Sequence, residues 1–230
     1  AINLLRRSLL GLTYYKVSSF INDIKSEYIV ATKNGLYLLK EKNIIKILDG
    51  EFYGVTFQND DIYVFERFNN KGRILKLKKE LRGSIEHFIT NLSSGCHQID
   101  FVDEKLFVTD TYNNRVIVFD RFGNMVQSYY PLGKLNKGRQ SSNYGHINSI
   151  FHHNTSFYLM CHNETVKTGR NSKILRCDEN FNIKETIKTE AKNAHNILLH
   201  DGNIFYCDSF NFSFVKNNKK VVKTKYFTRG

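Results

Sequence analysis

The sequence predicts an all-β fold, a five-bladed β-propeller of four-stranded antiparallel blades. Three observations lead to this prediction. The 230 residues include 18 Phe and 13 Tyr but only one Pro, a composition typical of strands and not of disordered chain. A pattern of apolar residues ending in a polar residue recurs along the chain. Finally, the copies of this pattern are spaced as propeller blades are.

The recurring pattern marks one strand of each repeated unit. Its clearest copy is LFVTD (106–110), and the others are YIVAT (28–32), IYVFE (62–66), FYLMC (157–161) and IFYCD (204–208). Each copy is preceded by one shorter apolar run and followed by two further strand-like runs, which form a hairpin. Polar turns such as Asn-Asp and Asp-Gly separate the runs. Each unit therefore contains four strands. Since one such sheet cannot bury both of its faces alone, we expect the units to stack around an axis.

The spacing of the units gives the expected domain organisation, which is a single propeller domain over residues 1–230. The blades are expected at roughly 19–50, 51–94, 95–143, 144–193 and 194–230. We expect residues 1–18 to cover an edge or to help close the ring. A short amphipathic helix is the alternative for this segment, because apolar residues recur there at helical spacing.

An equivalent anchor position is found by counting back 13 residues from the polar end of the second strand. This count reaches Ser19, Tyr53, His97 and His195. In the fourth blade Cys161 lies 15 residues after His146, and we attribute the difference to a longer turn around residues 152–154.

One blade carries a family resemblance. Residues 106–129, LFVTDTYNNRVIVFDRFGNMVQSY, resemble the NHL repeat of β-propellers. The matching residues are Val108, Asp110, Asn114, Arg115, Val116, Phe119, Asp120 and Gly123. The other blades diverge, and Arg115 has no clear counterpart in the last one. NHL propellers include RNA-binding modules, protein-binding modules and enzymes, so the resemblance does not choose a function.

Three of the eight histidines, His97, His146 and His195, stand at the start of the innermost strand in consecutive blades. Innermost strands line the channel of a propeller, and equivalent positions converge on its axis. Three imidazoles could then hold one divalent metal, with zinc favoured and iron(II) as the second choice. An open fourth position is typical of a catalytic site. The alternative is that the histidines only pack the mouth of the channel.

This arrangement is similar to the zinc site of the peptidyl-hydroxyglycine-cleaving lyase, an NHL-type propeller enzyme. The resemblance implies that His97, His146 and His195 are the metal ligands and that Tyr53, at the same anchor in the second blade, is catalytic. The family has six blades and takes its ligands from alternate ones. Here the ligands would come from adjacent blades of five, and the family's substrate is not carried over.

A second ring of side chains lies at the polar ends of the second strands. Glu66, Asp110, Cys161 and Asp208 are expected either to orient the histidines around the channel or to accept hydrogen bonds from loop N–H groups. For Cys161 the alternatives are a soft metal ligand and a small buried apolar side chain. The other histidines, His87, His152, His153, His162 and His200, are expected at the surface, although His162 directly follows Cys161.

The chain is basic, with a net charge of +12 and a lysine cluster over residues 216–225. Such a charge favours anionic partners. We expect a metal-dependent lyase or hydrolase acting on a small polar or anionic substrate. The alternative is a recognition scaffold that binds RNA, another polyanion or a protein partner, with surface tyrosines such as Tyr112, Tyr129, Tyr130 and Tyr144 taking part.

The cysteines and the hydropathy of the chain bear on its location. The four cysteines show no Cys-x-x-Cys spacing, which disfavours a zinc ribbon or a redox motif. No apolar run approaches the length of a membrane span. The cytoplasm is the default expectation, and the sequence predicts no oligomeric state.

Overall fold

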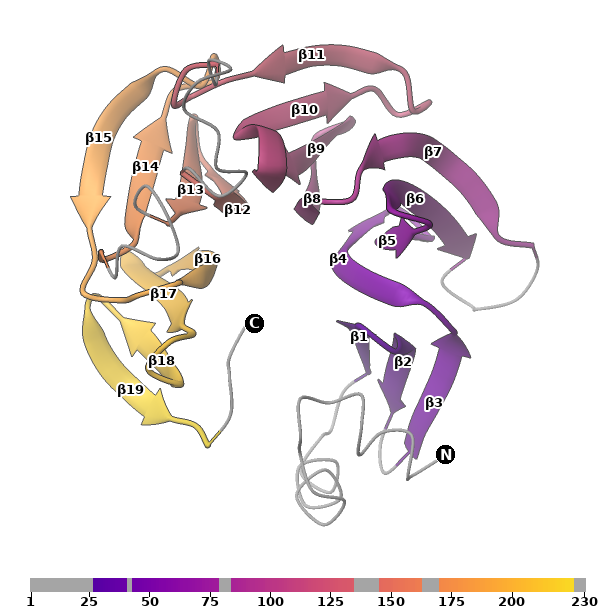
Figure 1. Ribbon diagram of the computed structural model, residues 1–230, viewed down its shortest axis with the longest axis horizontal. Coiled ribbons are helices and arrows are strands. Elements are labelled where there is room, and N and C mark those ends of the chain that lie inside the picture. Colours follow the sequence, from indigo (N-terminus) through magenta and orange to yellow (C-terminus); the bar gives the residue numbers. More distant parts are fainter. Residues whose placement is uncertain (1–26, 41–42, 79–83, 135–144, 163–169, 226–230) are drawn as a thin grey trace. The chain divides into compact units, whose positions relative to one another are not determined.

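A computed structural model describes residues 27–40, 43–78, 84–134, 145–162 and 170–225. The regular structure in these residues is almost entirely β, in five antiparallel sheets that follow one another along the chain (Figure 1). The predicted fold class, an all-β propeller of five blades, is confirmed. Residues 1–26, which contain the N-terminal segment and the expected innermost strand of the first blade, lie outside the described residues.

The chain forms two compact units, Ala1–Ser94 and Gly95–Gly230, and the single-domain expectation stays a prediction. The first unit holds two sheets. One consists, within the described residues, of β1 (Tyr28–Thr32), β2 (Gly35–Lys40) and β3 (Asn43–Leu48). The other consists of β4 (Glu51–Gln58), β5 (Asp61–Phe68), β6 (Lys71–Lys78) and β7 (Glu86–Ser93).

The second unit holds three four-stranded sheets. Their strands are β8 (Cys96–Val102), β9 (Lys105–Asp110), β10 (Arg115–Phe119) and β11 (Met125–Tyr129); β12 (Ile147–His153), β13 (Ser156–Cys161), β14 (Lys173–Cys177) and β15 (Ile183–Lys188); and β16 (His195–His200), β17 (Asn203–Asp208), β18 (Ser213–Lys216) and β19 (Lys219–Lys223). A short 3-10 helix, η1 (Thr111–Asn113), follows β9. No helix in the described part of the chain has the length and apolar character needed to cross a membrane.

Neighbouring sheets of the second unit bury their faces against each other. Along β13, Leu159 packs in a cluster with Phe107 of the preceding sheet, whereas Met160 packs in a cluster with Ile197 and Tyr206 of the following sheet. Successive side chains of a strand point to opposite faces. The middle sheet is therefore buried on both sides at β13, which explains why this strand reads as a continuous apolar run.

Two turns of the second unit repeat the same hydrogen bonds. The backbone N–H and side-chain amide of Asn124 both donate to the Asp120 carboxylate, and Asn182 donates to Asp178 in the same way. The Asn182 side chain is the main reason why the pKa of Asp178 is lowered to about 2. These matching turns, which connect the third and fourth strands of two sheets, are structural evidence for the internal repeat.

The first strand of each complete sheet contains a β-bulge near its start. The register shifts lie between Phe52 and Val55 in β4, Cys96 and Ile99 in β8, Ile147 and Ser149 in β12, and His195 and Ile197 in β16. A bulge inserts one extra residue and redirects the side chains around it. The anchor positions predicted from the sequence thus lie at or beside these bulges.

The longer turn predicted in the fourth blade is wrong. His153 pairs with Ser156, so the turn between β12 and β13 has two residues, as does the turn between His200 and Asn203. The additional length lies at the start of the strand. His146 precedes β12 and adopts a left-handed backbone conformation with φ of 45°, and it stands two residues before Asn148, the position that a count of 13 from Cys161 reaches.

Side chains join the first strands of the second unit, which lie side by side with β12 between β8 and β16 (Figure 1). The Gln98 side chain donates to the backbone oxygen of Ile150 (2.9 Å) and accepts from its N–H (3.0 Å). The Ser149 hydroxyl accepts from the N–H of Asn196 (2.8 Å). These bonds fix the three strands, and hence the residues at their starts, relative to one another.

Replacing Gln98 with Ala should destabilise the protein by about 1–3 kcal/mol, because the N–H and oxygen of Ile150 lose their partners in a partly buried place. Urea unfolding measures this free energy. The matched control is Gln127→Ala on β11, whose side chain is exposed and whose replacement should change stability by less than about 0.5 kcal/mol. Equal effects of the two substitutions would contradict a role for Gln98 in joining the strands.

Candidate functional site

The structure brings the three predicted histidines together within the second unit. His97, His146 and His195 each offer one ligand nitrogen, and these nitrogens lie within 4.8 Å of one another. The ring centroids are 5.2 Å apart for His97 and His146, and 6.3–6.4 Å apart for the other two pairs. His146 and His195 are buried, whereas His97 is half-buried. His97 is therefore the member of the cluster most open to solvent.

Each histidine reaches the cluster from a different backbone position. His97 is the second residue of β8 and lies in its bulge, and His195 is the first residue of β16. His146 lies before β12 in the left-handed conformation already described. The three side chains therefore converge although the backbone of His146 differs from that of the other two.

Backbone carbonyls orient two of the rings. The Nδ1 atom of His97 lies 3.0 Å from the oxygen of Gly95, and Nδ1 of His195 lies 2.8 Å from the oxygen of Asn193. The Ser209 hydroxyl also lies 2.9 Å from Nδ1 of His195. Because a carbonyl oxygen only accepts, Nδ1 carries a proton in both rings, and in the neutral imidazole Nε2 then carries the lone pair. This is the arrangement in which metal-binding histidines are usually held.

The sequence reasoning did not identify these orienting groups. A weak signal was present, since Gly95 and Asn193 each stand two residues before their histidine. Ser209 gave no signal, because it follows the second strand of its blade and meets His195 only through the pairing of β16 with β17.

A fourth histidine belongs to the cluster. His162 was expected at the surface, but it is 5% exposed and its ring stacks on that of His146 at 4.1 Å and 8°. Its ring also lies edge-on to that of His195 at 5.3 Å. The expectation was wrong because His162, directly after β13, turns its ring into the cluster. The local sequence does not reveal this tertiary contact.

Asn148 contacts one ring nitrogen of His162. Its Nδ2 donates to the oxygen of Ala194 (2.8 Å), which fixes the orientation of the amide, and lies 3.3 Å from Nε2 of His162. Since Nδ2 only donates, Nε2 of His162 is the acceptor in this contact, which corresponds to the tautomer of the neutral ring with its proton on Nδ1. Asn148 thus connects the ring to the start of the next sheet.

The spread of the cluster can be compared with a zinc site. With Zn–N distances of about 2.0–2.1 Å, two histidine nitrogens on a tetrahedral ion are about 3.3 Å apart. The 4.8 Å spread of the three ligand atoms is wider than this. The rings would therefore have to move closer together on binding an ion. The donor set of neutral imidazoles suits zinc.

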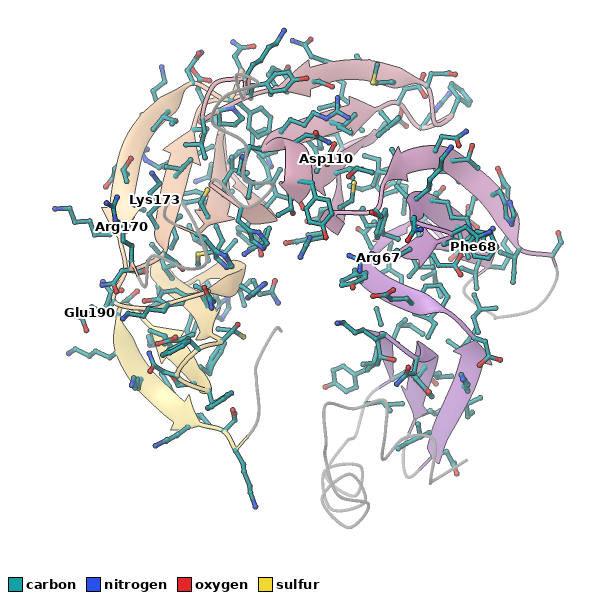
Figure 2. The ribbon with its side chains drawn as sticks, in the orientation of Figure 1. Arg67, Phe68, Asp110, Arg170, Lys173 and Glu190 are labelled. Carbon is teal, nitrogen blue, oxygen red and sulfur yellow. The ribbon has the colours of Figure 1, made fainter. Side chains whose placement is uncertain are left out.

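The predicted ring of acids is engaged in contacts within loops and strand pairs. Asp110, where β9 ends, accepts from Nε of Arg115 at 2.8 Å (Figure 2). Glu66 accepts from Nε of Arg73 at 2.5 Å, and Asp208 accepts N–H groups from two loop residues. The contacts of Asp208 correspond to the structural alternative, acceptance from loop N–H groups, whereas Asp110 and Glu66 accept from arginine side chains. Their role in orienting the histidines stays a prediction.

Cys161 is fully buried, and this burial raises the pKa of its thiol to about 12. A metal ligand must be the thiolate, which such a pKa disfavours. The side chain packs among apolar residues of the second unit. This environment favours the packing role of Cys161 over the soft-ligand role.

Tyr53 belongs to the first unit, in β4. Its hydroxyl donates to Glu51 (2.5 Å), and the guanidinium of Arg67, labelled in Figure 2, lies 4.9 Å from the centroid of its ring. The catalytic role of Tyr53 stays a prediction. Among the surface tyrosines, Tyr112 is 38% exposed, and Tyr144 lies outside the described residues.

No protein-family model matches the sequence, and no curated protein matches it. Solved structures match at low identity. A putative oxidoreductase (glucose dehydrogenase) from Thermus thermophilus matches with a TM-score of 0.64 and 10% identity, over 89% of this chain and 83% of that one. The Dos1 propeller matches with a TM-score of 0.51 and 13% identity, over 89% of this chain and 56% of that one.

Virginiamycin B lyase from Staphylococcus aureus matches as well. Its catalytically inactive histidine-to-alanine variant, solved with quinupristin, gives a TM-score of 0.56 and 18% identity, over 84% of this chain and 65% of that one. Such similarities establish a shared fold and nothing further. The resemblance to NHL repeats and to the zinc site of the hydroxyglycine lyase stays a prediction.

In the metal-free protein, above the ordinary histidine pKa of about 6.5, we expect His97, His162 and His195 to be Nδ1–H tautomers. Long-range ¹H–¹⁵N correlation spectra distinguish the two ring nitrogens, and single His→Gln variants assign the signals. Replacing Asn148 with Ala should change the Nε2 signal of His162 and leave the tautomer of His97 unaltered. An Nε2–H tautomer for His97 or His195 would show that the carbonyls do not orient these rings.

Proposed function

We propose that the protein is a metal-dependent lyase or hydrolase whose His97, His146 and His195 hold one divalent ion. The observation that supports this proposal is the 4.8 Å grouping of their ligand nitrogens. Zinc is the favoured ion, because three imidazoles with an open fourth position form a common catalytic zinc site. Iron(II) is the second choice, since its sites usually include a carboxylate. When bound, zinc polarises a substrate oxygen or lowers the pKa of a bound water.

The residues around the histidines have definite tasks in this proposal. The oxygens of Gly95 and Asn193 keep Nε2 of two rings ready to bind the ion. The burial of His146 and His195 excludes bulk water from one side of the site. A substrate would approach from the side of His97, the most accessible of the three.

Lyase or hydrolase chemistry fits a redox-silent ion. The similar virginiamycin B lyase loses activity when one histidine is replaced by alanine, so a propeller is compatible with histidine-dependent lyase chemistry. The net charge of +12 supports a small polar or anionic substrate. Tyr53 remains the proposed general base or oxygen ligand, on the resemblance alone.

The second candidate is a recognition scaffold for RNA or another polyanion. It is favoured by β19, whose Lys219, Lys220 and Lys223 are all exposed. Binding of this kind weakens steeply with salt and needs no metal. The two candidates therefore differ in a property that can be measured directly.

The wild-type protein, reconstituted with zinc and dialysed, should retain about one equivalent per chain, and His146→Ala should retain less than about a tenth of that, because two imidazoles hold zinc far more weakly than three. Elemental analysis by mass spectrometry measures this. His97→Ala should lose zinc to the same extent. Because His97 does not have the left-handed backbone conformation of His146, this variant removes a ligand without altering that conformation. The matched control is His200→Ala, at the exposed far end of β16, which should keep the full equivalent.

Stoichiometric zinc in His146→Ala, or none in the wild-type protein, would contradict the metal site. If the metal-free protein also bound single-stranded RNA with a steep salt dependence, the scaffold would be the better description.

A further inference from the structure

We propose that His162 is a positioning residue of the metal site, which holds the ring of His146 in the orientation that binds the ion and is not itself a ligand. This inference rests on the proposed function and adds a residue on which the affinity for the ion depends. Three contacts carry it: one through the backbone, one between rings and one through a side-chain amide.

The backbone joins His162 directly to His146. β12 pairs with β13 from Ile147 opposite Cys161, and the N–H of His162 donates to the oxygen of His146 (3.4 Å). This bond continues the pairing by one residue beyond both strands. Side chains of opposite residues in an antiparallel pair lie on the same face, so the backbone brings the two rings to one side of the sheet.

The rings of His162 and His146 stack face to face. Their centroids are 4.1 Å apart and their planes differ by 8°. The ring of His162 also lies edge-on to that of His195, at 5.3 Å and 85°, so it contacts two of the three proposed ligands. Because His162 is buried, its removal would open a space into which the ring of His146 could turn.

Stacking also suits the contraction that ion binding requires. The 4.8 Å spread of the three ligand nitrogens is wider than a tetrahedral zinc site allows. Parallel rings can slide over each other and stay in contact, whereas a tilt forces their atoms together. His146 can therefore approach the ion with the plane of its ring preserved.

Asn148 holds His162 in place and separates its role from that of the ligands. Nε2 of His162 lies 3.3 Å from Nδ2 of Asn148, which also donates to the oxygen of Ala194 (2.8 Å), just before β16. A nitrogen that accepts this hydrogen bond has its lone pair engaged. Within the described ranges, the group of ligand atoms that lie within 4.8 Å of one another contains the three proposed ligands but not His162.

The zinc affinity of the full chain, measured by competition with a chelating dye at one neutral pH, tests the proposal. His162→Ala and His162→Gln should bind zinc about 10–100-fold more weakly than the wild-type protein, which is the usual effect of losing a residue that supports a ligand. His162→Phe keeps a flat ring that can stack on His146 but has no nitrogen, and it should bind within about threefold of the wild type. Thermal unfolding shows which variants are folded, and the polar Gln variant decides the test if the Ala variant does not fold.

The matched control is His152→Ala. His152 lies near the far end of β12, and the centroid of its ring is 4.7 Å from that of Phe157. This substitution also removes a histidine that packs against another ring, but away from the cluster, so the zinc affinity should stay within about twofold of the wild type.

Equally tight zinc binding by the wild type and His162→Gln would overturn the positioning role and leave the metal site intact. A loss in His162→Phe as large as that in His162→Ala would overturn it as well, because a nitrogen and not the stacked ring would then be required. A wild-type protein that binds no zinc would overturn the proposed function together with this inference. Weakened binding confined to the Ala and Gln variants supports both.

Discussion

The arrangement of the second unit depends on burying both faces of its middle sheet. A strand such as β13 places Leu159 against the preceding sheet and Met160 against the following one, so its sheet is stable only with a neighbour on either side. Stacking in turn places the first strands of successive sheets side by side. Residues as distant in sequence as His97 and His195 meet only because this apolar packing comes first.

Hydrogen bonds between the first strands give the stacked sheets a defined arrangement at the site. Apolar faces can slide, but the two bonds between Gln98 and Ile150 and the bond between Ser149 and Asn196 fix the strands in register. Asn148 extends the same network to His162. The cluster is therefore supported by the interfaces between sheets, and its geometry depends on residues that never contact an ion or a substrate.

The sequence predicted the parts of the molecule that repeat. The apolar pattern identified the strands around LFVTD and its copies, and counting from Asp110 and Asp208 located His97 and His195. The departures from the repeat could not be found in this way. A bulge changes pairing without changing the hydrophobic pattern, so the extra length before Cys161 was assigned to a turn when it lies at the start of β12.

The remaining groups of the site escaped prediction because tertiary contacts create them. His162 follows the end of an apolar strand and precedes the polar residues Asn163 and Glu164 in the sequence, yet it is buried against His146. The carbonyl of Asn193 and the hydroxyl of Ser209 act on one ring from two separate loops. Any residue type has a backbone oxygen, so no composition or spacing marks the one that orients a histidine.

The left-handed backbone at His146 has a consequence for protein design. A symmetrical propeller made by copying one blade would give every copy the same backbone geometry at the anchor. In the natural chain His146 has this left-handed conformation, which His97 and His195 do not share. Identical copies of the blade of His97 or His195 would carry a histidine in each blade but would lack the backbone conformation from which His146 reaches the other two rings, so this particular grouping depends on one blade departing from the repeat.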